Sequence, residues 1–527
     1  MKSCLQNRRA GVVVESLESR RLFTAYLVDT SAALAAVNAR NLLAGDSVLL
    51  KGGTTISGNL VFDANDHGTA ASPIIVSSYD PSTGQAISPT AASSSRATLS
   101  AGNGDGIAVT NTAGINVIAL NVVGSGRTVN TGSGIRFVNN LAGNVKLQHL
   151  RVDHVDVGGF RNFGINLVGA AGKSGFADVR FTYVAAHDNG QAGIVTQGAF
   201  NATSTAYAHT DVYVGYCTTF NNPGIAGFSS NSGNGVVLSD IDRGTVEYSQ
   251  AYGNGALNTH DGGPVGIWAW DANAIVIQYN ESHHNHTNSS SDGGGFDLDG
   301  GVTNSVIQYN YSHDNDGSGY GMYQFSGARP WHDNIVRFNR SVNDARKNGY
   351  GALGFWNGGS GLKNAEFYNN TVVIDSAGAA KQPWAVKFMS EKLTSIHLRN
   401  NNFVTQGTAG MLYAFSTRKD TDLLLQGNNY YAVNTFDIKW SKKSYSTMTA
   451  WRTGSGQERL ANGTYVGLSV NPQFIDAQHQ IASASPLAHS GLNLRSLFNI
   501  NVGSVDLYGT VIPASPSTYS IGADWIT

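Results

Sequence analysis

The sequence predicts an all-β solenoid in which short parallel strands wind into stacked coils. Three observations favour this fold class: the composition, a repeat of about thirty residues and a recurring asparagine. Glycine accounts for 63 of the 527 residues, and only 13% of residues are charged. A composition rich in Gly, Asn, Ser, Thr and Val favours short strands joined by tight turns. Because solenoids grow in one dimension, a chain of this length needs no division into several globular domains.

The repeat is clearest in residues 276–283, with the sequence VIQYNESH, and residues 306–313, with the sequence VIQYNYSH. Each copy consists of an apolar strand, usually an Asn, a short strand and a loop that contains Gly. Three short strands and three turns per unit are what a parallel β-helix requires. We therefore predict a parallel β-helix over residues 26–430.

The recurring asparagine predicts an internal ladder along the solenoid. Asn tolerates a left-handed backbone, and its side-chain amide can bond to the equivalent Asn of the next coil. The expected members are Asn280, Asn310, Asn339, Asn369 or Asn370, and Asn400 or Asn401.

The two ends of the chain differ from the repeats. Residues 1–25 are expected to be a leader that is disordered or removed, although the apolar run after the basic residues is too short for an ordinary secretory signal. Residues 31–38 form an apolar helical pattern, and a helix there would cap the open end of the solenoid. Residues 431–527 are expected to form irregular coils and a tail that packs back on the solenoid.

Several segments resemble those of known proteins. Residues 15–23, ESLESRRLF, resemble the LEPR-XLL tag of exported bacterial proteins, with Ser in place of the usual proline. The opening coils, with Gly68-Thr69 and the PIIV sequence of residues 73–76, resemble right-handed parallel β-helix proteins of the pectate lyase and chondroitinase B types. The resemblance implies a right-handed coil, a secreted or cell-surface location and a substrate groove on the first sheet, bordered by the loop of residues 284–295. The Asn-Thr-Asp and Gly-His-Gly motifs of polygalacturonases do not occur in the sequence.

A pair of aspartates marks the candidate reaction centre. Side chains alternate along a strand, so Phe296 and Leu298 point to one face while Asp297 and Asp299 point to the other. Alternate side chains lie about 6.6 Å apart, which is the lower edge of the spacing between acid and base in inverting glycosidases. A neighbouring carboxylate and burial would raise one of the two pKa values. We predict that Asp297 and Asp299 are catalytic; the alternative is that they cap turns or bind structural calcium.

Aromatic residues occupy the matching outward positions of the neighbouring coils when residues 267–270, 322–325 and 353–356 are superposed on residues 296–299. Sugar rings present apolar faces that stack on aromatic side chains, and exposed tryptophans are costly unless they are used. The superposition predicts that Trp268 and Tyr323 each lie one coil from Asp297. The predicted substrate-binding residues are Trp268, Trp270, Tyr323, Phe325 and Trp356, with Ile267, Phe296, Met322 and Leu353 facing inward.

The same region also offers ligands for calcium. Asp292, Asp314 and Asp316 supply the hard oxygen atoms that this ion prefers. In a lyase the ion would neutralise a uronate while Lys, His or Tyr removes the α-proton, so His283, His313 and Lys387 are further candidates for substrate contact. Calcium is optional in this prediction, and no redox or nucleotide cofactor is expected. The loop of residues 283–286, HHNH, matches no standard zinc spacing.

The composition limits the classes of partner. A formal net charge of −2 argues against a nucleic acid. No apolar run reaches the roughly 18 residues of a membrane span. We predict a monomeric exported enzyme that hydrolyses a polysaccharide or oligosaccharide with paired aspartates. A calcium-assisted polysaccharide lyase and a non-catalytic glycan-binding surface protein are the alternatives.

Overall fold

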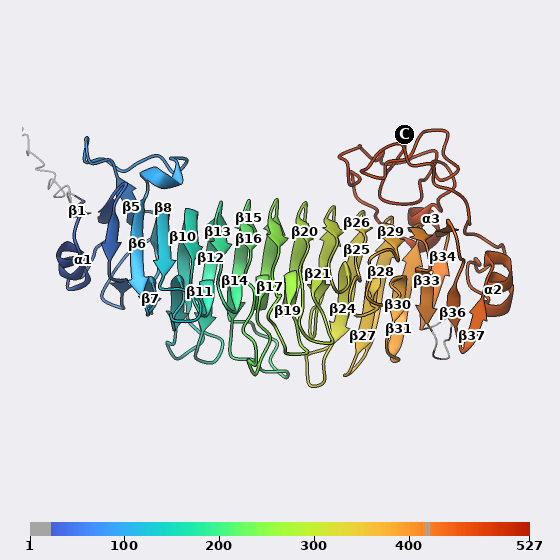
Figure 1. Cartoon of the computed structure of the whole chain (residues 1–527), viewed down its shortest axis with the longest axis horizontal. Coiled ribbons are helices and arrows are strands. Elements are labelled where there is room, and N and C mark those ends of the chain that lie inside the picture. Colours follow the sequence, from blue (N-terminus) through green and yellow to red (C-terminus); the bar gives the residue numbers. More distant parts are fainter. Residues whose placement is uncertain (1–22, 415, 417–418, 420–421, 527) are drawn as a thin grey trace, which may run out of the picture.

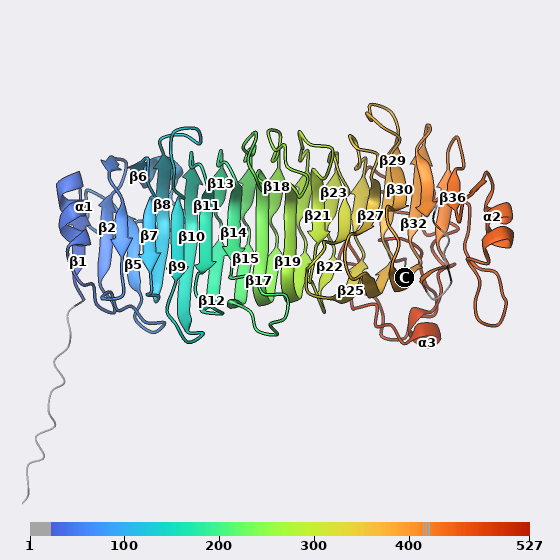
Figure 2. The same ribbon diagram turned by 90° about the horizontal axis from the view of Figure 1, so that it is seen from below.

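The computed structural model describes residues 23–526, except for residues 415, 417–418 and 420–421. The described chain is an elongated right-handed parallel β-solenoid, as Figures 1 and 2 show from two sides. The predicted fold class is therefore confirmed. The predicted leader lies outside the described residues up to residue 22.

Each full coil contributes a strand to each of three stacks, and equivalent strands pair in parallel from coil to coil. Four long strands run from one stack into the next: β8 (Ile115–Gly124), β10 (Lys146–Gly158), β17 (Asn234–Glu247) and β19 (Val265–Gln278). Stack 1 contains β4 (Leu60–Phe62), β7 (Ile107–Thr110), β9 (Ile135–Asn139), β11 (Phe163–Gly169), β14 (Ala192–Gln197), the first parts of β17 (Asn234–Glu247) and β19 (Val265–Gln278), β21 (Gly294–Leu298), β24 (Tyr320–Gln324), β27 (Gly351–Asn357), β30 (Trp384–Phe388), β33 (Gly410–Ala414) and β36 (Ile438–Trp440). Here β36 also pairs antiparallel with β37 (Lys443–Tyr445).

The other two stacks complete the coil. Stack 2 contains β1 (Ala25–Val28), β2 (Ser47–Lys51), β5 (Ile74–Tyr79), β8 (Ile115–Gly124), β10 (Lys146–Gly158), β12 (Gly175–Thr182), β15 (His209–Gly215), the ends of β17 and β19, β22 (Val306–Gln308), β25 (Trp331–Arg337), β28 (Leu362–Tyr368), β31 (Leu393–Arg399) and β34 (Leu423–Gln426). Stack 3 contains β3 (Thr55–Ser57), β6 (Ala97–Gly102), the ends of β8 and β10, β13 (Ala185–His187), β16 (Thr218–Phe220), β18 (Gln250–Tyr252), β20 (Glu281–His283), β23 (Tyr311–His313), β26 (Arg340–Val342), β29 (Thr371–Asp375), β32 (Asn402–Gln406) and β35 (Asn429–Ala432).

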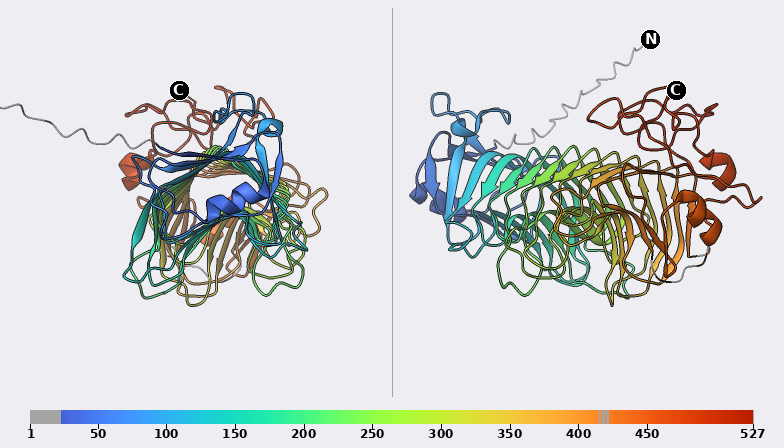
Figure 3. Two further views of the ribbon diagram at one scale, coloured as in Figure 1. Left: turned by 90° about the vertical axis from the view of Figure 1, so that its left-hand side faces the viewer. Right: turned by 45° about the vertical axis from the view of Figure 1, so that its right-hand side comes forward.

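Helix α1 (Ser31–Asn38) closes the N-terminal end of the solenoid, as the left view in Figure 3 shows. The helix begins where the Thr30 hydroxyl accepts a hydrogen bond from the backbone N–H of Ala33 at 3.1 Å, a standard N-cap. Leu34 and Val37 are buried and join the apolar core that runs through the coils. The helix predicted at residues 31–38 is confirmed, and it covers core residues that would otherwise face water.

The predicted asparagine ladder is present and continues beyond the predicted members. The Asn280 side chain donates to Asn310 Oδ1 at 3.1 Å, and Asn310 donates to Asn339 Oδ1 at 3.1 Å. Of the alternatives Asn369 or Asn370 and Asn400 or Asn401, the second residue of each belongs to the ladder. The ladder continues through Asn370, Asn401 and Asn428 and ends on the carboxylate of Glu458.

A second ladder was not predicted. It lies at the turn that follows stack 3, where each side chain bonds to the next along the solenoid. Its members are Asn189, Asn222, Asn254, Asn285, Asn315 and Asp344. The two ladders satisfy the buried polar groups of two of the turns and hold successive coils in register.

The C-terminal segment includes α2 (Met448–Ser455) and α3 (Leu494–Phe498), and it returns along the outside of the last coils (Figure 1). The Asn369 side chain donates to the carbonyl oxygens of Ser520 and Gly522 at 2.9 and 3.1 Å. In the described part of the chain, no helix has the length and apolar character needed to span a membrane.

Candidate active site

A pocket of about 740 Å³ lies on the outer face of stack 1. The strands β19, β21, β24 and β27 form its floor, and loops that enter and leave stack 1 form its walls. We call it the acidic pocket, and its lining residues are Phe200, Ser230, Asn231, His260, Asp261, Gly262, Gly263, Val265, Trp268, Trp270, Ser291, Asp292, Asp297, Asp299, Tyr323, Phe325, Tyr350, Trp356 and Met389. The structure thus brings both predicted catalytic aspartates and all five predicted aromatic residues into one pocket.

The pairing register of the strands that form the pocket floor differs in part from the predicted register. Trp268 pairs with Asp297 as predicted, but Asp297 pairs with Gly321 on the next coil, where Tyr323 was expected. Tyr323 instead pairs with Trp356. The shift amounts to two residues, which leaves every side chain on its predicted face because side chains alternate with a period of two.

Glycine at position 321 allows Tyr323 to reach back toward Asp297. A Cβ atom at Gly321 would lie only 2.7 Å from the Tyr323 ring. The ring therefore covers the glycine backbone, and its hydroxyl donates to Ser318 Oγ at 2.8 Å. This arrangement keeps the Tyr323 side chain in the lining of the acidic pocket even though the strand pairing is shifted.

Asp297 is the most strongly perturbed carboxyl group of the pocket. The residue is only 3% exposed, and its Oδ1 atom has no hydrogen-bond partner among the described residues. Burial raises the pKa of Asp297 well above its ordinary value, and the nearby carboxylates of Asp299 and Asp292 raise it further. The Asp297 carboxyl group is therefore the stronger candidate in the pocket for a proton donor.

Asp299 and Asp292 differ from Asp297 because backbone N–H groups stabilise their ionised forms. Burial raises the pKa of Asp299 to about 6, and the N–H of Gly300, at 2.6 Å from Oδ1, opposes the shift. Burial raises the pKa of Asp292 to about 7, opposed by the N–H of Gly263 at 2.5 Å from Oδ2. The pocket thus holds Asp297, whose pKa is raised well above its ordinary value, beside Asp299, whose pKa is about 6.

The aromatic residues of the pocket are not all exposed platforms. The expectation that Trp268 is exposed is wrong: it is 4% exposed, and its indole N–H donates to Asn234 Oδ1 at 3.0 Å. It packs against apolar side chains of neighbouring coils, so it forms part of the pocket floor. Trp356, by contrast, is 40% exposed and is available for stacking.

Phe200 completes an aromatic group that the sequence did not reveal. Its ring centroid lies 5.8 Å from that of Trp270 and 6.2 Å from that of Phe325. Phe200 comes from the loop after β14, three coils before the floor strand β21, and no local pattern indicates that this loop reaches the pocket. The loop residues of the pocket walls, such as His260 and Tyr350, were likewise not predicted.

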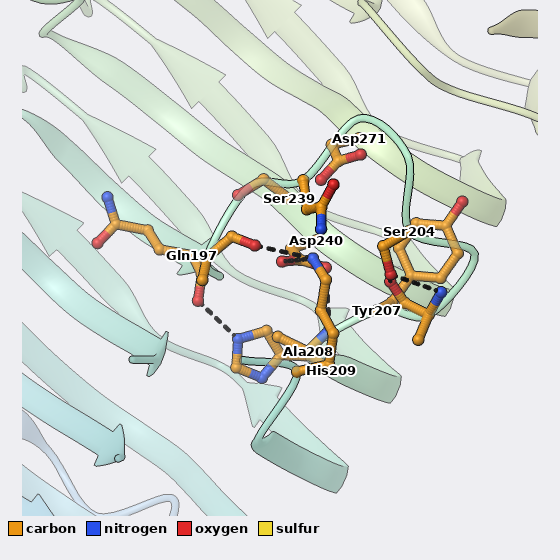
Figure 4. A network of polar contacts seen from close by, with 12 residues as sticks. Gln197, Ser204, Tyr207, Ala208, His209, Ser239, Asp240 and Asp271 are labelled. Carbon is orange, nitrogen blue, oxygen red and sulfur yellow. Dashed lines mark hydrogen bonds and ion pairs between the residues drawn. The ribbon is translucent and has the colours of Figure 1, made fainter. Parts of the chain in front are cut away.

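A buried polar network holds the loop that carries Phe200 (Figure 4). Lys173 Nζ pairs with Asp240 Oδ2 at 2.6 Å and donates to the carbonyl of Ala199 at 2.9 Å. From the other side, Arg329 Nε pairs with Asp271 at 2.7 Å.

Arg329 also contacts the loop directly. Its guanidinium donates to the carbonyls of Asn201 and Ala206, and it lies 4.3 Å from the ring centroid of Tyr207. Removing one partner from a buried network of this kind would leave charges unpaired. The network therefore fixes the loop and, with it, the position of Phe200.

The remaining predicted residues lie outside the acidic pocket. His283 and His313 are on β20 and β23 of stack 3. Lys387 is on stack 1, three coils from Asp297, and its Nζ donates to the carbonyl of Gly349 at 2.5 Å.

The predicted calcium ligands are not brought together. Asp292 lines the pocket, whereas Asp314 pairs with His313 at 2.9 Å and Asp316 accepts from the N–H of Thr287 at 3.0 Å. Within the described residues, His283, His284 and His313 are the one group of three or more His, Cys, Asp or Glu side chains with ligand atoms mutually close enough to hold a metal ion.

No protein-family model matches the chain, and no curated protein matches it. Several solved structures are similar to it at low sequence identity. One is a GH136 lacto-N-biosidase from Eubacterium ramulus, with 17% identity over 77% of this chain and 67% of that chain, at a TM-score of 0.47. Others are the A-module of the mannuronan C-5 epimerase AlgE6 from Azotobacter vinelandii, with 12% identity over 84% and 94% of the two chains and a TM-score of 0.44, and the pectate lyase Pel9A, with 14% identity over 96% and 97% and a TM-score of 0.42.

Proposed function

We propose that the chain is a glycoside hydrolase that cleaves an uncharged carbohydrate in the acidic pocket. The observation that carries this proposal is the pairing of a buried Asp297, whose pKa is raised well above its ordinary value, with Asp299, whose pKa is about 6. Two carboxyl groups whose environments separate their pKa values are what acid and base catalysis of glycoside cleavage requires. The aromatic lining supplies apolar surfaces for sugar rings.

The two aspartates have complementary roles in this mechanism. The Asp297 carboxyl group donates its proton to the glycosidic oxygen as the bond from that oxygen to the anomeric carbon breaks. The Asp299 carboxylate accepts a proton from the water whose oxygen bonds to the anomeric carbon. Proton exchange with solvent then restores both groups. Asp297 is on β21 and Asp299 directly follows it, and on extended backbone alternate side chains lie about 6.6 Å apart. That spacing is enough for this water, so we propose inversion at the anomeric carbon.

The charge of the pocket supports an uncharged substrate. Its lining includes four aspartates and neither Lys nor Arg. A uronate or sulfate group would face these carboxylates without a side-chain cation to pair with. Lys387, the candidate proton acceptor for β-elimination, lies outside the lining. These features favour hydrolysis over the lyase alternative.

A product assay on neutral, uronic and sulfated polysaccharides tests the proposal. We expect new reducing ends from a neutral glycan and no unsaturated, ultraviolet-absorbing product. Proton NMR during the first turnovers should show the inverted anomer. An unsaturated uronate product would establish the lyase alternative, and glycan binding without any product would establish the non-catalytic one.

A further inference from the structure

A second site lies on stack 3, away from the acidic pocket. His283 ends β20 and His313 ends β23, and the two residues are directly paired on successive coils. His284 follows β20 with a left-handed backbone (φ 50°), which turns its side chain toward the other two. We call these residues the histidine cluster. Its members come from two strands whose separation is fixed by backbone pairing, so the scaffold beneath them is rigid.

The imidazole rings meet closely. The Nδ1 atoms of His283 and His284 are 2.8 Å apart, and one ring nitrogen from each of the three residues lies within 4.8 Å of the others. The His283 and His313 rings are stacked with centroids 4.6 Å apart, and the His284 ring stands nearly perpendicular to both. Three nitrogens bound to one tetrahedral zinc ion lie about 3.3 Å apart, so the His283 and His313 rings would tilt out of their stacked arrangement to converge on one ion.

Two carboxylates adjoin the cluster. Asp314 Oδ2 is 2.9 Å from His313 Nδ1, and Glu281 Oε1 is 3.2 Å from His313 Nε2. A carboxylate on Nδ1 fixes the tautomer of a metal-binding imidazole, and an ion at this site would replace the proton that His313 Nε2 shares with Glu281. Glu281 is then placed to supply a fourth, anionic ligand. His284 is exposed, so an ion can enter from solvent.

We propose that His283, His284 and His313, together with Glu281, bind a first-row transition metal ion of the zinc type. Three imidazole nitrogens and one carboxylate oxygen form a donor set that suits Zn²⁺ and excludes the all-oxygen coordination of Ca²⁺ and Mg²⁺. The ion would join two successive coils. It is independent of the hydrolytic mechanism, because the cluster contributes no residue to the acidic pocket.

Titration calorimetry of the tag-free chain with ZnCl₂ tests this site. We expect one bound ion per chain, and a His284→Ala variant should bind at least tenfold more weakly. His284 is exposed, so its removal should leave the fold intact. The matched control is His332→Ala, since His332 is half-buried and paired with a carboxylate, Asp333, but lies outside the cluster. Affinity in this control should equal that of the parent chain.

Two further readouts separate a built site from loose surface binding. Co²⁺ bound by the parent chain should show the intense visible absorption of tetrahedral coordination, and Glu281→Gln should weaken that band. Zn²⁺ should raise the melting temperature of the parent chain more than that of His284→Ala. Absence of binding, equal affinity in the His284 and His332 variants, or an octahedral Co²⁺ spectrum would overturn the proposal.

Discussion

The asparagine ladders and the acidic pocket both bury polar side chains in the central coils, and they treat those side chains in opposite ways. Asn310 accepts from the backbone and side-chain N–H groups of Asn280, and its own amide donates to Asn339 and to two carbonyl oxygens. Asp297 is buried to a similar extent, yet its Oδ1 atom has no partner among the described residues.

The difference shows which buried groups support the fold and which are kept for a ligand. In a ladder, each coil supplies the partner that the neighbouring coil needs, so burial costs little and the coils are held together. In the pocket, the equivalent of Asp297 on the next coil is Gly321, which supplies no side chain. The Asp297 carboxyl group therefore has a raised pKa and an oxygen atom without a partner among the described residues. Such unpaired, perturbed groups are typical of reaction centres.

Replacing the pocket aspartates should have the largest effect. We expect Asp297→Asn and Asp299→Asn each to lower kcat by a factor of about 10³ or more with little change in oligosaccharide binding, because the interactions lost exist only in the transition state. Steady-state kinetics and calorimetric binding would measure this. Asp333→Asn, at an exposed position of β25 outside the pocket, is the matched control and should retain full activity. If either pocket variant keeps more than a tenth of the parent kcat, the assigned roles are wrong.

Replacing a ladder asparagine should lower the stability of the fold and leave kcat nearly unchanged. Asn310→Ala leaves several buried donors and acceptors unpaired, so the free energy of unfolding should fall by about 3 kcal/mol or more. Denaturant unfolding would measure the change, and kcat of the folded variant should stay close to that of the parent. Asn65→Ala, at an exposed position outside both ladders, should change stability by less than about 0.5 kcal/mol. A small effect of Asn310→Ala would mean that the ladder adds little stability.

The pKa of Asp299 predicts opposite pH responses for activity and stability. The rate should fall about tenfold per pH unit below about 6, because the catalytic base becomes protonated. A carboxyl group with a raised folded-state pKa stabilises the fold at low pH, and this stabilisation is lost as pH rises through about 6. Unfolding measurements at pH 5 and pH 7 should therefore show a smaller pH dependence for Asp299→Asn than for the parent chain. An unchanged pH dependence would show that Asp299 titrates normally.

Replacing the exposed Trp356 should have the smallest effect of these substitutions. Trp356→Ala should weaken binding of longer oligosaccharides by about three- to tenfold, which corresponds to roughly 1 kcal/mol, with kcat nearly unchanged. Tyr465→Ala removes a similarly exposed aromatic ring outside the pocket and should leave binding unchanged. Equal oligosaccharide affinity in the Trp356 variant and the parent would show that Trp356 does not contact the substrate.

The sequence predicted features that depend on local periodicity. The capping helix at Ser31–Asn38, the first ladder and the outward face of Asp297 all follow from patterns within one or two repeats. The two-residue shift that separates Tyr323 from Asp297 could not be predicted, since a period of two gives both registers the same inward and outward faces.

Features that join distant parts of the chain were also missed. The loop with Phe200 reaches the pocket because Lys173 and Arg329 hold it there, and these residues lie far from it in the sequence. His283 and His313 are thirty residues apart in sequence but adjacent in space, so the sequence around either residue shows no standard zinc-binding spacing.

The ladder also bears on how solenoids of this kind change length. Asn401 presents to Asn370 the same acceptor that Asn370 presents to Asn339. Coils that make identical contacts above and below are interchangeable modules, so an insertion or deletion of one whole coil preserves the bonding pattern on both sides. The length of stack 1, and with it the outer face that carries the acidic pocket, can therefore change by duplication or loss of single coils without redesign of the core.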